Sequence, residues 1–307
     1  MSKLVLTENF RKLVLIDGNA IMHRSFHALP TSLTTSYGEP INAVYGFVSM
    51  LLRTIQDLKP THIAVCFDRP EPTFRKKEFA GYQSKRPEMD ITLSSQFEKM
   101  QDTLKAIGIP VYSKAGFEAD DLIGTISKQA QVDEVIIVTG DKDILQLVDK
   151  KIKVYMPTKG MSEGKIHEEE DVKQKLGVTP KQIIDYKALI GDSSDNYPGV
   201  AGIGPKTAVS LIEKYQTLEN IYDHISEVKE STSRRLLEGR KMGFMCKRLA
   251  TIVTDVDVDF NLEQARKWKI DNPDVIDLFK DYSFKTLTKR VQDVGKLVQS
   301  DNQLTLL

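Results

Sequence analysis

Residues 116–143 read GFEADDLIGTISKQAQVDEVIIVTGDKD, and this stretch decides the fold. It holds two clusters of acids: Glu118, Asp120, Asp121, Asp141 and Asp143. A helical pattern follows the first cluster, and the apolar run 135–138 predicts a strand that leads directly into the second. Acids therefore stand at the start of a predicted helix and at the end of a predicted strand.

Two earlier apolar runs end in the same way, 13–16 before Asp17 and 63–67 before Asp68. Short β-branched runs that are separated by helical patterns, such as the one at 42–58, predict parallel strands in an α/β sheet. Ligands of such sheets bind at the carboxyl ends of the strands. Three strands that each deliver an acid to that edge predict one shared acidic site.

Any one of these acids could simply be a helix cap or a turn residue. As a set they are harder to explain, because two carboxylates about 5 Å apart repel by roughly 3 kcal/mol at an effective dielectric near 20. Such a cluster needs bound cations. No His or Cys accompanies the acids, and ligands that are all oxygen suit Mg²⁺, or Mn²⁺ in its place, rather than Zn²⁺. The sequence therefore predicts a divalent-metal site.

The chain of 307 residues has 43 basic and 43 acidic side chains, so its formal charge is zero. If nine of the acids hold metal ions, the basic residues exceed the remaining acids by nine, and a neutral total can hide a surface that attracts nucleic acid. The two cysteines form no disulfide or zinc pattern, and no signal peptide or membrane span is recognisable. We expect a cytoplasmic monomer without a membrane partner.

Residues 69–86 read RPEPTFRKKEFAGYQSKR, a segment in which cations alternate with aromatic rings. A path for single-stranded nucleic acid has this composition, because the charges follow phosphates and the rings stack on bases. A solvated basic loop can have it as well. The residues that we expect to contact DNA here are Phe74, Arg75, Lys76 and Tyr82. The prolines and Gly81 indicate that the segment is not one rigid helix.

Beyond about residue 178 the α/β pattern gives way to helices, which predicts a domain boundary. This part presents two more acids, Asp192 and Asp195. The glycine-rich turn 199–204 would let a DNA backbone approach closely, and the amides of the next helix can hold a phosphate. The expected DNA contacts are Gly199, Gly202, Gly204, Lys206 and Thr207. The sequence of this turn is close to the phosphate-binding loop of an NTPase. However, Pro205 shifts the lysine by one position and no strand is predicted before the turn, which argues against an NTPase.

Together these motifs resemble the structure-specific 5′-nuclease (flap endonuclease) family, and most closely the 5′→3′ exonuclease domain of bacterial DNA polymerase I. The resemblance extends from about residue 13 to about residue 284 and keeps the order of the motifs. The family's nine characteristic carboxylates match Asp17, Asp68, Glu118, Asp120, Asp121, Asp141, Asp143, Asp192 and Asp195. The glycine-rich turn matches the family's DNA-backbone motif, and Arg24 matches an arginine that contacts phosphate.

The resemblance implies a fold with three parts. Residues 1–178 would form an α/β nuclease core, with a parallel sheet of the resolvase or PIN type and a helical arch at about 69–95. Residues 179–300 would form a helical DNA-binding domain that contains a helix-hairpin-helix-type motif. The tail 301–307 includes QLTLL at 303–307, which resembles peptides that bind the bacterial sliding clamp, although a plain apolar tail would look the same.

The same resemblance implies 5′→3′ exonuclease and flap endonuclease activity on 5′ flaps, nicks and recessed 5′ ends of DNA by two-metal catalysis. We expect one ion on Asp17, Asp68, Glu118 and Asp120 and the other on Asp141, Asp143, Asp192 and Asp195. Asp121 would bridge the ions or stand behind their ligands. The family also implies a K⁺ ion on main-chain carbonyls of the turn 199–204.

One position of the arch departs from the family pattern Tyr-Lys-x-x-Arg, in which the lysine points at the scissile phosphate. Tyr82 and Arg86 are kept, but Gln83 replaces the lysine. Either Lys85 reaches the phosphate instead or turnover is reduced. The expected catalytic residues are therefore Arg86, Lys85, Gln83 and Asp121. Two alternatives stay open: a catalytically weakened protein that binds DNA junctions, and an RNA-cleaving nuclease with a similar acidic core.

Overall fold

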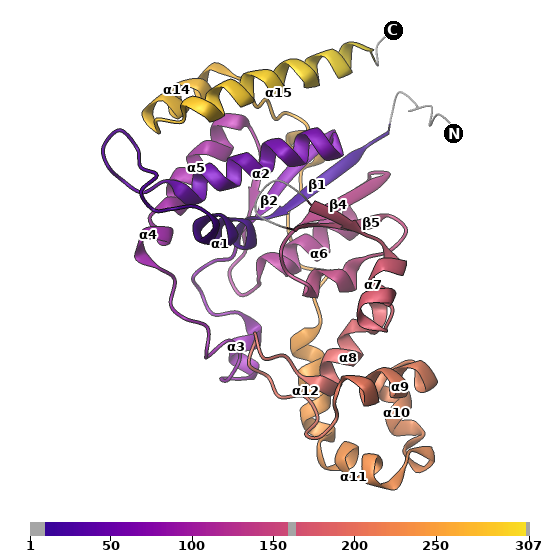
Figure 1. Ribbon diagram of the computed structural model, residues 1–307. Coiled ribbons are helices and arrows are strands. Elements are labelled where there is room, and N and C mark those ends of the chain that lie inside the picture. Colours follow the sequence, from indigo (N-terminus) through magenta and orange to yellow (C-terminus); the bar gives the residue numbers. More distant parts are fainter. Residues whose placement is uncertain (1–9, 159–163, 305–307) are drawn as a thin grey trace.

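A computed structural model describes residues 10–158 and 164–304 of the protein (Figure 1). For residues 301–304 it describes the helical backbone alone. The expected clamp-binding segment 303–307 therefore lies largely outside the described residues.

Within the described residues, a six-stranded sheet has the strand order β3-β2-β1-β4-β5-β6. The strands are β1 (Lys12–Asp17), β2 (His62–Cys66), β3 (Val111–Tyr112), β4 (Glu134–Val138), β5 (Ile152–Pro157) and β6 (Gly164–His167). β1 to β5 pair in parallel, as the pattern predicts. β6 pairs antiparallel with β5, so the sheet is mixed rather than parallel throughout. The connection 158–163 is too short for the crossover that a parallel pair needs.

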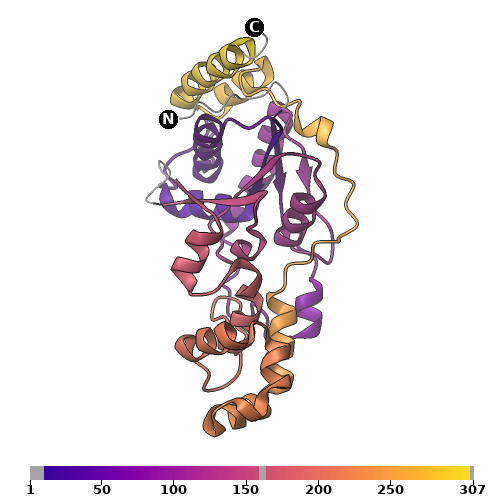
Figure 2. The ribbon, with the colours of Figure 1, turned by 90° about the vertical axis from the view of Figure 1, so that its right-hand side faces the viewer.

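The central strands are buried on both faces. In β1, Leu13 and Leu15 join the hydrophobic cluster on one face, while Val14 and Ile16 join the cluster on the other, and all four are at most 2% exposed. Strands covered by helices on both sides are typical of parallel α/β sheets. One face is covered by α1 (Gly18–Ala28), α2 (Asn42–Leu58) and α5 (Gln96–Ile107), and the other by α6 (Ala119–Gln129) (Figure 1, Figure 2).

The segment expected to form a helical arch, 69–95, contains little helix. Its helices are α3 (Phe74–Glu78) and α4 (Ile91–Ser94), and residues 79–90 between them are not helical. In Figure 1 the segment passes below the sheet toward the helical part of the molecule. The irregular backbone agrees with the prediction, from its prolines and glycine, that this is not one rigid helix.

A helical part follows β6 and shares the hydrophobic cluster of α6. Its α-helices are α7 (Glu169–Leu176), α8 (Ile183–Ile190), α9 (Pro205–Tyr215), α10 (Leu218–Asp223), α11 (Glu230–Glu238) and α12 (Arg240–Ala250). The 3₁₀ helices are η1 (Asp143–Leu147), η2 (Pro180–Gln182) and η3 (Ile225–Glu227). None of the helices that the structure describes combines the length and the apolar character needed to cross a membrane.

The last helices return to the sheet. The segment 251–272, which includes α13 (Leu262–Ala265), leads back from α12 to α14 (Pro273–Asp281) and α15 (Lys285–Leu304) (Figure 2). Phe279 of α14 and Leu287 of α15 are fully buried in the cluster that contains α2 and α5. These helices therefore pack on the core, although the sequence assigns them to the helical domain 179–300. An amphipathic pattern reveals an apolar face but not the surface that the face covers.

Replacing Phe279 with alanine should show that α14 is part of the core. The ring is 0% exposed, so its removal should lower the free energy of unfolding by about 3–5 kcal/mol. Urea unfolding of the full chain measures this change. Leu297→Ala is the matched control, because Leu297 is 55% exposed on α15 and its loss should cost less than about 0.5 kcal/mol. A loss below about 1 kcal/mol for Phe279→Ala would contradict the packing.

Candidate metal centre

Three adjacent strands deliver acids to one edge of the sheet. Asp17 ends β1, while Asp68 and Asp141 follow β2 and β4 within three residues. β1 lies between β2 and β4 and pairs in parallel with both, so the carboxyl ends of all three strands are side by side. The shared edge that the sequence predicts is confirmed.

Helix starts converge on the same edge and supply N–H donors to these acids. Asp17 is the N-cap of α1: one oxygen accepts a hydrogen bond from the Ala20 amide at 2.9 Å, and the other accepts one from the Thr139 hydroxyl at 2.7 Å. Asp68 accepts a hydrogen bond from the Ala119 amide at 2.7 Å, at the start of α6. Asp17 is therefore a helix cap and a member of the cluster at once. Asp68 lies at the start of α6 without being its cap, and both positions are favourable because a helix N-terminus stabilises negative charge.

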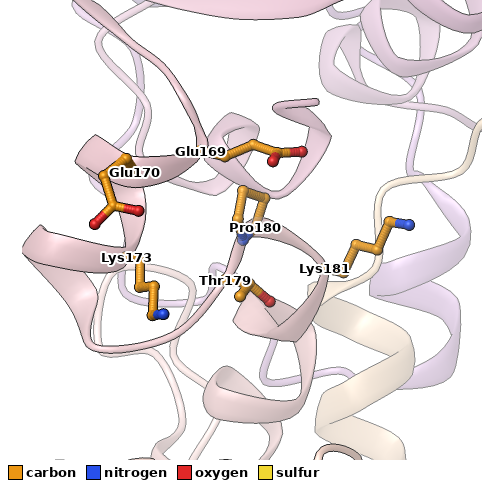
Figure 3. A pocket seen from close by; sticks show the side chains of 6 residues that line it. All are labelled: Glu169, Glu170, Lys173, Thr179, Pro180 and Lys181. Carbon is orange, nitrogen blue, oxygen red and sulfur yellow. The ribbon is translucent and has the colours of Figure 1, made fainter. Parts of the chain in front are cut away.

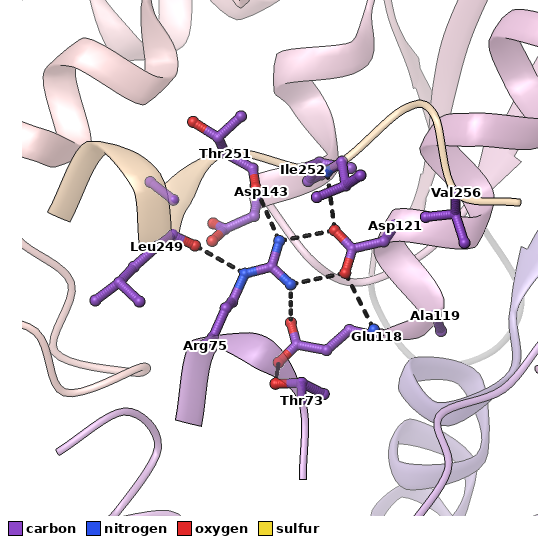
Figure 4. A network of polar contacts seen from close by, with 12 residues as sticks. Thr73, Arg75, Glu118, Ala119, Asp121, Asp143, Leu249, Thr251, Ile252 and Val256 are labelled. Atoms are coloured by element: carbon purple, nitrogen blue, oxygen red, sulfur yellow. Dashed lines mark hydrogen bonds and ion pairs between the residues drawn. The ribbon is translucent and has the colours of Figure 1, made fainter. Parts of the chain in front are cut away.

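The acids at the start of α6 differ in where they point. Glu118 is the N-cap residue and is partly exposed, as is Asp120. Asp121 is 0% exposed, and both of its oxygens bond the guanidinium of Arg75 at 2.7 Å (Figure 4). Of the two roles expected for Asp121, bridging the ions or standing behind the ligands, this placement favours the second.

A second group of acids meets at the end of α8. Asp143, Asp192 and Asp195 each offer a carboxylate oxygen, and these oxygens all lie within 4.8 Å of one another. Among the residues that the structure describes, no other three acids gather so tightly. The ammonium of Lys187, on α8, bonds both Asp143 and Asp192. A built-in cation therefore already neutralises part of this group.

The two groups of acids act on each other electrostatically. Burial raises the pKa of Asp17 and of Glu118 to about 7 and that of Asp143 to about 6. For Asp120, burial and then the charges of Asp141 and Asp17 raise the pKa well above its usual value. Asp141 also raises the pKa of Asp17 and of Asp143, so it links the strand-edge acids to the group at α8.

The arch contacts Asp195 through three side chains. The Gln83 amide donates a hydrogen bond to Asp195 at 3.1 Å, and the Tyr82 hydroxyl donates one at 3.2 Å. Arg86, which is 55% exposed, places a guanidinium nitrogen 3.4 Å from the same carboxylate. Lys85 is exposed. The residue at the family's lysine position therefore holds a candidate metal ligand and does not point into open space.

Two of the expected DNA contacts in the arch are buried. Arg75 is 2% exposed and Tyr82 is 3% exposed, and both are bonded to acids. Neither can stack on a base or reach a phosphate, so the expectation that they contact DNA is not retained. Phe74 is partly buried, with its ring tilted against that of Phe117, and Lys76 is exposed. Cations and rings in a short irregular segment show no periodicity from which burial could be read.

The glycine-rich turn joins α8 to α9 and has the backbone that only glycine adopts easily. Gly199 and Gly202 have φ of +67° and +79°, and a Cβ on Gly199 would meet the Gly191 nitrogen at 2.2 Å. Gly204 is the N-cap of α9 and offers no side-chain cap, so the first amides of α9 are open to an anion. Arg235 donates a hydrogen bond to the Gly202 carbonyl at 2.9 Å.

The remaining expected DNA contacts lie at two places. Lys206 and Thr207 stand in the first turn of α9, with Lys206 exposed. Arg24 lies on α1 and donates a hydrogen bond to the Thr158 carbonyl.

Sequence reasoning missed three residues of this site. Lys187 pairs with two acids. Asn196 donates to the Gly81 carbonyl at 2.8 Å and to the Ser84 hydroxyl at 2.9 Å. The buried hydroxyl of Tyr197 lies near the same acids and has no hydrogen-bond partner among the described residues. Their one signal is proximity in sequence to Asp192 and Asp195. Nothing in the sequence shows that their side chains turn toward the acids.

One cavity among the described residues lies away from the acids. It has a volume of about 400 Å³, and Figure 3 shows it between α7 and η2. It is lined by Glu169, Glu170, Lys173, Thr179, Pro180 and Lys181. None of these residues belongs to the predicted site.

The raised pKa values predict how stability depends on pH when no metal is bound. Asp17, Glu118 and Asp143 have a higher pKa in the folded protein than in the unfolded chain, so the folded state binds more protons between about pH 4 and pH 7. The free energy of unfolding should fall as the pH rises through this window. In EDTA the melting temperature should drop by several degrees between about pH 5 and pH 8. Millimolar Mg²⁺ or Mn²⁺ should cancel the drop, because the ion binds the ionised carboxylates. A melting temperature that rises with pH in EDTA would contradict these shifts.

Two family models match the chain. The N-terminal resolvase-like domain of 5′-3′ exonucleases matches residues 12–177, and the C-terminal SAM fold of 5′-3′ exonucleases matches residues 178–274. The chain is 40% identical over 284 residues to DNA polymerase I of Caldicellulosiruptor bescii, and 39% identical over 297 residues to that of Bacillus subtilis. These matches cover 91% and 96% of the chain but 33% and 34% of the relatives, so the chain spans about one third of their length.

Solved structures of phage and Rad2 nucleases share the fold. T5 5′-exonuclease with bound zinc ions superposes with a TM-score of 0.65 at 21% identity, over 94% of this chain and 100% of that chain. The catalytic core of Rad2 in complex with a DNA substrate gives 0.60 at 16% identity, over 93% and 91%. The model of the N-terminal domain alone matches more than half of the chain, and the model of the C-terminal domain matches the residues that follow. The chain therefore belongs to the 5′-3′ exonuclease family.

Proposed function

We propose that this chain hydrolyses phosphodiester bonds of DNA at 5′ flaps, nicks and recessed 5′ ends, as a 5′→3′ exonuclease and flap endonuclease. One observation carries the proposal: three adjacent strand ends deliver acids to one edge of the sheet, and these acids act electrostatically on the group Asp143, Asp192 and Asp195, which the basic arch contacts. Family membership supports the same reaction.

The donor set suits Mg²⁺, with Mn²⁺ able to replace it. The acids offer hard oxygen ligands, and among the described residues the buried hydroxyl of Tyr197 near them has no hydrogen-bond partner, so it could bond a water molecule of a hydrated ion. We assign one ion to Asp17, Asp68, Glu118 and Asp120 and the other to Asp141, Asp143, Asp192 and Asp195. Bound there, divalent ions supply an activated water and stabilise the leaving oxygen.

The residues of the chain orient the substrate phosphate. The Arg86 guanidinium lies beside Asp195 and acts electrostatically on Asp68, so it interacts with both groups of acids. From that position it can bind the scissile phosphate and offset its charge. Exposed Lys85 adds charge from the same turn of the arch. Gln83, being neutral and bonded to Asp195, keeps that carboxylate in place but cannot stabilise charge as a lysine would.

The turn 199–204 and the start of α9 would bind the duplex as a helix-hairpin-helix-type motif. Glycines allow close approach of the DNA backbone, while the open amides of α9, with Lys206 and Thr207, can hold a phosphate. A K⁺ ion here would rest on the remaining carbonyls, since Arg235 already donates to Gly202. Arg24, Phe74 and Lys76 would contact the DNA elsewhere.

The domain plan follows from these roles. Residues 1–178, with the arch at 69–95, would supply most of the metal ligands. The helical part from 179 would hold the duplex and add Asp192 and Asp195. We also propose that the protein works as a monomer in the bacterial cytoplasm and that the segment 303–307 docks on the sliding clamp. Loss of clamp binding on deleting these five residues is the result that the last proposal requires.

The double substitution Asp141→Asn with Asp143→Asn should abolish cleavage of a 5′-labelled DNA flap. Asp141 and Asp143 are both assigned to the second ion, so this ion loses two of its four ligands, and Asp141 also acts electrostatically on Asp120, which is assigned to the first ion. Single-turnover rates in Mg²⁺ should fall by at least about a thousandfold, while Asp277→Asn, an exposed change on α14, should cleave normally. Unchanged cleavage by the double variant would refute the mechanism. If the unaltered chain binds the flap but does not cleave it in Mg²⁺ or Mn²⁺, it is a junction-binding protein. If it cleaves a matched RNA flap faster than the DNA flap, it is an RNA nuclease.

The substitution Gln83→Lys should accelerate cleavage. A lysine at this position adds a cation next to the scissile phosphate, and one such interaction can contribute about 3 kcal/mol, so kcat should rise by roughly tenfold to a hundredfold. Gln83→Leu removes the bond to Asp195 without adding charge and should not raise kcat. An unchanged rate for Gln83→Lys would mean that Lys85 or Arg86 already supplies the charge.

A further inference from the structure

Arg75 is the one basic residue of α3 that is buried. It is 2% exposed, whereas Lys76 and Lys77 on the same short helix are exposed. An arginine taken out of water must be matched by opposite charge and by a full set of hydrogen bonds, since an unpaired buried charge is strongly destabilising. The partners of Arg75 therefore show what the residue is for.

All five N–H groups of the Arg75 guanidinium have acceptors (Figure 4). Two parallel bonds of 2.7 Å join it to the two oxygens of Asp121, and a third of 3.2 Å reaches Glu118. The other two go to main-chain carbonyls at the end of α12, 2.9 Å to Leu249 and 2.8 Å to Thr251. A planar guanidinium with every donor used has little freedom to move.

Asp121 is saturated in the same way. One of its oxygens accepts from Arg75 and, at 2.9 Å, from the Val253 amide. The other accepts from Arg75 and, at 3.1 Å, from the Glu118 amide. A carboxylate offers about four acceptor sites, so a divalent ion could reach Asp121 only by displacing one of these donors.

We propose that Asp121 is the fixed counter-ion of Arg75 and does not ligate metal, and that Arg75 is a positioning residue that sets the metal ligand Glu118 in place. The inference rests on the proposed function, which assigns Glu118 to an ion. Together with Asp121, Arg75 joins three segments that are far apart in sequence: the base of the arch, the start of α6 and residues 249–253 at the end of α12. A shift of the arch or of α12 thus moves Glu118, and metal binding responds to both.

A double-mutant cycle on the full-length chain tests the proposal. The variants are Arg75→Gln, Asp121→Asn and the two combined, and Mn²⁺ binding by calorimetry is the readout. Loss of a residue that orients a ligand typically weakens metal binding by about 10–100-fold. We expect both single variants to lose about that much affinity at one Mn²⁺ site with the number of sites unchanged, and the combined variant to be no worse than the weaker single one.

The sign of the Arg75→Gln effect separates positioning from plain electrostatics. Removing a positive charge beside the acids should by itself tighten Mn²⁺ binding, whereas misplacing Glu118 weakens it. Lys77→Gln removes the same charge from the exposed face of the same helix and should leave Mn²⁺ affinity unchanged or slightly tighter. Glu118→Gln provides the reference for a variant that has lost a true ligand.

Breaking half of a buried pair can prevent folding, so melting temperatures are measured for every variant. If a single variant does not fold, Arg75→Lys keeps the charge but not the five bonds and should still weaken Mn²⁺ binding by about tenfold. The combined variant leaves no unpaired charge and should still bind as many Mn²⁺ ions as the unaltered chain.

The proposal would be overturned if Asp121→Asn or the combined variant lost an Mn²⁺ site, as Glu118→Gln should. It would also be overturned if Arg75→Gln or Arg75→Lys bound Mn²⁺ with unchanged or higher affinity. Additive losses of Mn²⁺ affinity in the double-mutant cycle would be a third contradiction. Flap cleavage by the unaltered chain decides the proposed function separately. If the unaltered chain cleaves the flap but the double-mutant cycle gives one of these three results, only the positioning role of Arg75 is refuted and the proposed function stands.

Discussion

Crowding of carboxylates at one edge of the sheet is the constraint on which the rest of this structure depends. Repulsion within such a group would open the fold unless opposite charge, N–H donors or protons compensate it. The structure provides all three. Arg75 and Lys187 are built-in cations, the starts of α1 and α6 supply N–H donors, and burial raises the pKa of Asp17 and of Glu118 to about 7. The expectation that only bound metal makes the cluster tolerable is therefore too strong, since part of the compensation belongs to the chain.

The two built-in cations divide the acids by role. Arg75 is fully buried and saturated, so the carboxylate of Asp121 is committed to structure. Lys187 bonds Asp143 and Asp192, two of the three acids whose oxygens lie close enough to share one ion. A divalent ion there must share these carboxylates with the ammonium or displace it. The arch adds neutral hydrogen-bond donors, from Tyr82 and Gln83, to Asp195. Asp121, the pair Asp143 and Asp192, and Asp195 therefore each have their own donor groups within the chain.

The arch is fastened to the helical part by a small apolar cluster and by polar contacts. In the cluster, Tyr82 and Phe79 of the arch pack with residues of α12 and with Tyr197. At its base Arg75 bonds the end of α12, and further along, the side chain of Asn196 bonds Gly81 and Ser84. Beyond α3 the arch is irregular, at residues 79–90, which leaves backbone groups such as the Gly81 carbonyl open to side chains of the helical part. Its position relative to the acids is therefore set by parts of the chain more than a hundred residues away.

The sequence by itself determined the elements that depend on local pattern. Buried β-branched runs ending in Asp17, Asp68 and Asp141 predicted adjacent parallel strands and a shared acidic edge, because strand burial and direction follow from periodicity and connection length. The all-oxygen ligand set and the positive φ angles of glycines in the turn 199–204 could also be predicted, because ligand chemistry and tolerance of positive φ depend on residue type alone.

Only the tertiary structure decided which partner each side chain meets. The burial of Arg75 and Tyr82, the turn of Lys187 toward two acids and the packing of α14 on the core all join residues that are distant in sequence or lie in elements too short to show a period. In the sequence, a basic residue next to an aromatic one looks the same whether its side chain faces water or a buried carboxylate. The choice depends on the free energy of burying the charge, and that is fixed by acceptors which other segments of the chain bring to it.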